Sequence, residues 1–194
     1  MHLLRWAFDS AVSGNGKPWP AHLPRPTKSP PLESHEQVAT EVMLCALAFL
    51  LHHELAHRRL SHAPVAAGCT SIDQERDADY EAAAWILGTC GGDVFDKRAL
   101  GVTVALAILV ALRIHMGSDA ASTHPRSFDR LINTLDRHVH DPNHICWGVA
   151  IIIFKLHMDR AAIAVPEIPY DTCRAVAEAY ADMLAARSET HAGP

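Results

Sequence analysis

Residues 34–60 contain neither glycine nor proline. Those two residues are the usual interruptions of a helix, so the stretch predicts one helix of about seven turns. Its middle, Val42 to Leu51, is almost entirely apolar, and its end is the polar run HHELAHRRL. A chain containing a helix of this length is expected to build its core from other helices packed against it.

The rest of the chain fits that expectation. Ser71 to Gln74 reads as a capping box, and Gly88 is a natural helix end. Pro125 is suited to the first position of a helix that ends before Pro142. The further helices are expected at about 71–88, 96–116, 125–141, 144–160 and 171–187. Strand-like alternation is absent, and although a short strand near 61–69 is compatible with the pattern, we predict a mainly α-helical domain.

The 194 residues suffice for one domain with a substantial core. Residues 13–31 are rich in glycine and proline, which predicts an extended arm rather than a separate domain. We therefore divide the chain into an N-terminal segment, 1–32, and a helical domain, 33–194.

The composition of the chain limits the classes of partner and the cellular compartment that we expect for this protein. The net charge is −5 and no dense basic run occurs, which argues against nucleic acid as a partner. The five cysteines include no CxxC pair and indicate free thiols in a reducing cytoplasm. Residues 1–8 do not form a convincing signal peptide. The longest uncharged apolar run, 99–112, is shorter than the ~20 residues of a membrane span, so we expect a buried core helix and no membrane partner.

The polar end of the first helix contains His53-Glu54-Leu55-Ala56-His57, an HExxH motif. Residues four apart lie on one face of a helix, so both imidazoles can reach one metal ion, and zinc suits imidazole ligands. Glu54 is one residue beyond the first ligand. It is therefore expected beside the metal, as the general base that takes a proton from the attacking water. The alternative is a solvated helix end.

A catalytic zinc site needs a third protein ligand, and the helix at 71–88 offers one. Glu75 and Asp79 are four residues apart, and their face is extended at helical spacing by Ile72, Ala82 and Ile86. Two inward-facing carboxylates are costly without a cation or hydrogen-bond donors. We assign Glu75 as the third ligand and Asp79 as the acceptor that orients a ligand histidine. A solvated acidic helix is the alternative.

A third segment is Ser122-Thr123-His124-Pro125, followed by Arg130 in the next helix. Peptide hydrolysis needs a donor for the oxyanion that forms at the carbonyl. His124 or Arg130 is expected to supply it and to lie beside the metal ligands. The alternative is a helix cap and a surface arginine.

Three segments in this order, HHELAH at 52–57, QERDADYEAAAWIL at 74–87 and STHPRSFDRL at 122–131, resemble the peptidase family of the phage-exclusion protein Lit. They are more distantly similar to the CAAX-prenyl-protease and heat-shock membrane zinc proteases, which share HExxH, ExxAD and THP motifs. The resemblance covers about residues 36–155. It implies a gluzincin, with ligands at His53, His57 and Glu75, a base at Glu54 and Asp79 behind them. It also implies cleavage of a protein substrate, translation elongation factor Tu, during phage infection.

The leading hypothesis is thus a zinc-dependent endopeptidase acting on a protein or peptide. A second is a non-catalytic zinc-binding regulatory protein, whose site would be closed by a fourth ligand from this chain; the candidates are His52, His62, His124 and Cys69. A third is a membrane-associated protease that uses residues 99–112 and 145–154 as lipid contacts.

Overall fold

The computed structural model of this chain describes residues 18–21, 25, 27–62, 72–88, 90–116, 126–160, 162–165, 169 and 171–191. In this part of the chain it contains six helices and no strand, so the mainly α-helical prediction is confirmed. The helices are α2 (His35–Arg59), α3 (Ile72–Leu87), α4 (Gly92–Met116), α5 (Ser127–His138), α6 (Ile145–Arg160) and α7 (Cys173–His191). The residues of the suggested strand, 61–69, lie mostly outside the described ranges.

The helix boundaries differ from the expected ones by a few residues. α4 begins at Gly92, four residues early, and Asp93 in its first turn interacts favourably with the helix dipole. α5 ends at His138 because Val139 adopts an extended backbone. α7 continues to His191, since no glycine or proline intervenes before that residue.

The chain divides into two compact units, residues 1–40 and 41–194. In the first unit, the start of α2 is fixed by Ser34, whose hydroxyl accepts a hydrogen bond of 3.1 Å from the backbone N–H of Gln37. The side chain of Gln37 in turn accepts a bond from the backbone N–H of Glu33. These bonds satisfy two donors at the helix start.

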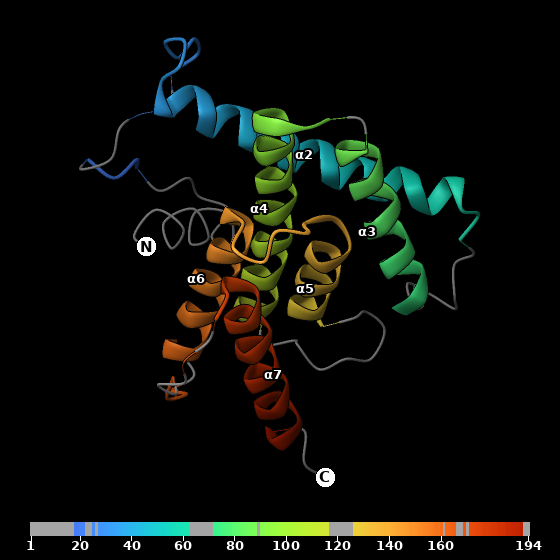
Figure 1. The fold of residues 1–194 in the computed structure, drawn as a ribbon, viewed down its shortest axis with the longest axis vertical. Helices are drawn as coiled ribbons and strands as arrows, with labels where there is room; N and C mark the ends of the chain where they lie inside the picture. The colour runs from blue at the N-terminus through green and yellow to red at the C-terminus, as the bar shows by residue number, and fades with distance from the viewer. Residues whose placement is uncertain are drawn as a thin grey trace. The chain divides into compact units, whose positions relative to one another are not determined.

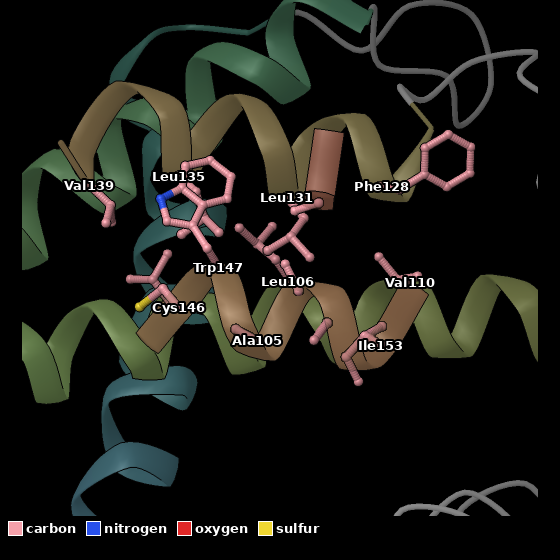
Figure 2. Packing of buried hydrophobic residues seen from close by; sticks show 14 of the residues in the cluster. Ala105, Leu106, Val110, Phe128, Leu131, Leu135, Val139, Cys146, Trp147 and Ile153 are labelled. Atoms are coloured by element: carbon pink, nitrogen blue, oxygen red, sulfur yellow. The ribbon is translucent and has the colours of Figure 1, made fainter. Parts of the chain in front are cut away.

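In the second unit, α4 packs against α3, α5 and α6, and α7 packs against α5 and α6 (Figure 1). Figure 2 shows Trp147 of α6 beside Leu135 of α5, with Leu106 of α4 nearby. All three side chains are at most 2% exposed. The apolar run at 99–112 supplies buried residues of α4 to this core, as expected; they include Ala99, Val102, Ala105, Leu106 and Val110.

α2 crosses α4 at a glycine. A Cβ placed on Gly101 would collide with Cβ of Cys45 and would lie 3.0 Å from the backbone oxygen of Val42. Lys97 of α4 adds an ion pair of 2.6 Å with Glu41 of α2. The missing side chain of Gly101 therefore allows the two backbones to approach closely at this point.

The opposite face of α2 is exposed and apolar. Its large exposed side chains include Met43, Leu44, Leu47, Leu51 and Leu55. Among the described helices, α2 alone has the length and apolar composition that a membrane span would need, and only 17% of its most apolar stretch is buried.

Candidate metal centre

The first half of the site lies on the buried stripe of α2. Val42, Ala46, Phe49, His53 and Ala56 are buried and follow one another at intervals of three or four residues. This spacing keeps them on one helix face. His53 therefore continues an apolar stripe into the interior and is 6% exposed, whereas His57, one turn later, is half-buried.

The second half comes from α3, whose inner face contains two carboxylates. Glu75 is 5% exposed and Asp79 is 1% exposed. Ala82 and Ile86 continue this face into the core, as the spacing predicted. Ile72 does not: its side chain is 46% exposed at the beginning of the helix, so its predicted inward orientation is wrong.

Three potential ligands converge where the two helices meet. Nε2 of His53 lies 3.1 Å from Nε2 of His57. Glu75 Oε2 is 3.5 Å from His53 Nε2, and Glu75 Oε1 is 3.4 Å from His57 Nε2. One ligand atom from each residue lies within 4.8 Å of the others, so the three could hold one metal ion. The sequence predicted this set.

The carboxylates also meet a guanidinium from a third helix. Arg130 of α5 donates two hydrogen bonds of 2.7 Å to Asp79, and its Nη1 lies 3.3 Å from Glu75 Oε2. Asp79 Oδ1 is 2.9 Å from Nδ1 of His53, a short contact that is poorly aligned for a hydrogen bond. Asp79 thus contacts both a histidine and an arginine, and Arg130 supplies the donors that buried carboxylates require.

The charges of the site shift its pKa values in opposite directions. Burial alone would lower the pKa of His53, but its contacts with Asp79 and Glu75 raise it to about 9. Burial and the neighbouring charge of His53 lower the pKa of His57. Burial opposes the charge of Arg130 as well, yet Asp79 and Glu75 raise its pKa. In the absence of a metal, His53 therefore carries the proton of the pair.

The donor set fits a cation. Two Nε2 atoms that face each other at 3.1 Å cannot both present lone pairs unless a proton or a cation lies between them. Two imidazoles and one carboxylate are also the ligand types that zinc accepts. The three residues are therefore suited to zinc, although Arg130 shares the carboxylates with whatever ion they would hold.

The other described residues that the sequence suggested for the site do not belong to the group formed by His53, His57 and Glu75. Glu54 is exposed on α2, next to His53, and its charge acts on both His57 and Arg130. His124 and Cys69 lie outside the described residues. The ring of His52 stacks on Trp85 at 3.8 Å between centroids. The sequence suggested His62 only as a candidate fourth metal ligand. In the structure its Nδ1 lies 2.9 Å from Nδ1 of His57.

A cavity of about 270 Å³ adjoins these residues between α3 and α5. Asp79 and Arg130 belong both to its lining and to the candidate metal centre. The other lining residues are Ile72, Arg76, Tyr80, Arg126, Asp129, Asn133 and Thr134. The sequence did not reveal this cavity, because it forms only when α3 and α5 pack together.

The chain is similar in sequence to one known protein family and to one named protein. A sequence model of the family described as Peptidase U49 matches residues 1–150. The chain is 33% identical over 135 residues to a protein of Escherichia coli (strain K12) named cell death peptidase. That match covers 69% of this chain and 45% of the relative, so the chain spans about half of the relative's length. No solved structure matches.

Proposed function

The chain belongs to the Peptidase U49 family, and on that premise we propose that it is a zinc-dependent endopeptidase that hydrolyses peptide bonds in a protein substrate. The observation that carries the proposal is the convergence of His53, His57 and Glu75 within 4.8 Å. Two of these residues belong to HExxH and the third to the next helix, which is the ligand arrangement of a gluzincin.

In this proposal His53, His57 and Glu75 hold the ion. Bound zinc supplies Lewis-acid chemistry, polarising a carbonyl and making water a better nucleophile at neutral pH. Glu54 accepts the proton of the attacking water and later delivers it to the leaving amine. Its exposed side chain beside His53 supports this role, because a general base must meet a substrate that arrives from solvent.

Asp79 and Arg130 position the ligands. The Arg130 guanidinium contacts the carboxylates of Asp79 and Glu75, which leaves it poorly suited to receive a new oxyanion. We therefore assign to His124, the other candidate, the role of hydrogen-bond donor to the oxyanion. Arg130 is assigned the role of orienting the two carboxylates. The cavity between α3 and α5 is then the proposed site for a substrate side chain, since it borders the ligands through Asp79.

The proposed substrate follows from the resemblance to Lit-type peptidases, which implies translation elongation factor Tu and a role in phage defence. The name of the Escherichia coli relative, cell death peptidase, agrees with cleavage of an essential host protein. Such a substrate is cytoplasmic, in keeping with the compartment that the free cysteines suggest. This chain spans only part of the relative's length. That it recognises elongation factor Tu is therefore itself part of the proposal.

Glu54→Gln tests the proposed chemistry. Purified elongation factor Tu and a fluorescence-quenched peptide library are incubated with zinc-loaded protein, and fragments are identified by mass spectrometry. The variant is expected to keep its zinc and to lose about 10²- to 10⁴-fold in rate. Glu81→Gln, which changes a carboxylate of α3 paired with Arg59, is the matched control and should retain activity. Equal rates in wild type and Glu54→Gln would remove Glu54 from the mechanism.

A further inference from the structure

Each ligand histidine has a polar side chain close to both of its ring nitrogens. His57 directs Nε2 toward His53 and Glu75, and its Nδ1 lies 2.9 Å from Nδ1 of His62. His53 also has Nε2 toward His57, and its Nδ1 lies 2.9 Å from Asp79 Oδ1, although that contact is poorly aligned for a hydrogen bond. Thus Asp79 stands behind one ligand, and His62 stands in the equivalent position behind the other.

The backbone at the end of α2 explains how His62 reaches this position. The N–H of His62 bonds to the carbonyl of His57 at 3.0 Å, and the N–H of Ser61 bonds to the carbonyl of Arg58 at 3.2 Å. Ser61 has a positive φ of 54°. These three features define a Schellman cap, in which the side chain of the third residue beyond the helix commonly touches that of the third residue from the helix end. Here those two residues are His62 and His57.

We propose that His62 is a positioning residue that accepts a hydrogen bond from Nδ1–H of His57 and so keeps Nε2 of His57 directed at the metal position. The inference rests on the proposed function, because it assigns His62 to the zinc site. A histidine that binds metal through Nε2 must carry its proton on Nδ1, and a partner for that proton fixes both the tautomer and the ring orientation.

The same contact assigns the proton of His62. If its Nδ1 accepts from His57, its own proton lies on Nε2, and its Nδ1 lone pair is occupied. His62 approaches His57 at Nδ1, whereas His53 and Glu75 approach at Nε2. His62 therefore acts behind the ligand, not as the fourth ligand that would close the site.

The test compares three substitutions for their effect on zinc affinity, measured by competition with a chelator. His62→Leu removes the acceptor and is expected to weaken zinc binding by about 10- to 100-fold. His62→Asn places an amide oxygen near the position of Nδ1 and should stay within about threefold of wild type, since it can still accept the bond. His140→Leu, at an exposed histidine, is the control and should have no effect.

A second pair of variants moves His62 without changing it. Ser61→Gly tolerates the positive φ and should keep wild-type zinc affinity. Ser61→Val disfavours that φ because valine is β-branched, so it should weaken zinc binding in the same direction as His62→Leu. Equal affinities for the two Ser61 variants would contradict the role of the cap.

Three outcomes separate the alternatives. Unchanged zinc affinity in His62→Leu would overturn the positioning role while leaving the peptidase proposal intact. An equal loss in His62→Asn and His62→Leu would make His62 a ligand itself and would also overturn it. If wild type binds no zinc, the proposed function fails. Imidazole ¹⁵N spectra of the metal-free protein then decide the inference. A proton on Nδ1 of His57 whose hydrogen-bonded chemical shift is lost in His62→Leu supports the contact. A proton on Nε2 of His57 refutes it.

Discussion

Arg130 donates two hydrogen bonds to the carboxylate of Asp79, from Nε to Oδ2 and from Nη2 to Oδ1, each 2.7 Å long. This bidentate pair joins α5 to α3 directly behind the candidate ligands. Both side chains are at most 10% exposed, so bulk water stabilises the two charges only weakly.

Arg130→Ala is expected to destabilise the metal-free protein by about 3–5 kcal/mol, because it removes one of the two cations that face the buried carboxylates and leaves only the protonated His53 beside them. Urea unfolding measures the change. Arg137→Ala, in the same helix but exposed over the ring of Tyr80, is the matched control and should cost no more than about 1 kcal/mol. A loss of less than about 1 kcal/mol in Arg130→Ala would mean that the pair contributes little to folding. Saturating zinc should return part of the lost stability, since the ion adds positive charge beside Glu75.

The proton on His53 predicts a pH-dependent zinc affinity. Its pKa in the metal-free protein is raised to about 9, so the ring is protonated at pH 7 and must lose a proton to become a ligand. Zinc affinity should therefore rise about tenfold per pH unit from pH 7 and level off above pH 9. Calorimetric titrations in buffers of different ionisation enthalpy should detect release of about one proton per zinc at pH 7.5. An affinity that is constant from pH 7 to pH 9 would contradict the raised pKa.

Gly101→Ala tests how closely α2 and α4 approach. The added methyl would meet the side chain of Cys45 and the backbone of α2, so we expect a destabilisation of about 1–3 kcal/mol despite the higher helix propensity of alanine. Gly148→Ala, in α6, is the control: a Cβ there meets nothing within 4 Å, and the change should stabilise by about 0.5–1 kcal/mol. Two variants that shift the urea midpoint in the same direction would refute the close crossing.

The sequence predicted the helices well because glycine and proline mark most of their ends. It also predicted that His53, His57 and Glu75 would lie together, since the spacing of four between His53 and His57, and between Glu75 and Asp79, places each pair on one helix face. The THP segment contributed to the family resemblance, which the family match confirms. The position of His124 itself stays a prediction.

Contacts that depend on packing or on local backbone conformation were beyond the sequence. The hydrogen bonds of Arg130 to Asp79 join residues 51 positions apart and form only when α3 and α5 meet. The contact of His62 with His57 depends on the left-handed backbone conformation of Ser61. The sequence does not predict this conformation, because the residue is not a glycine. The exposed apolar face of α2 was not predicted either, because hydrophobicity alone does not tell a core helix from one that is covered on one side only.

Zinc content per chain tests the central claim most directly. Protein purified without added metal is measured by elemental analysis for wild type, Glu75→Ala and the control Glu81→Ala, with circular dichroism to confirm that each is folded. We predict about one zinc in wild type and in Glu81→Ala, and a large loss in Glu75→Ala, because two imidazoles alone hold zinc weakly. Wild-type protein that binds no zinc, even after incubation with the metal, or a folded Glu75→Ala with undiminished zinc, would contradict the three-residue site.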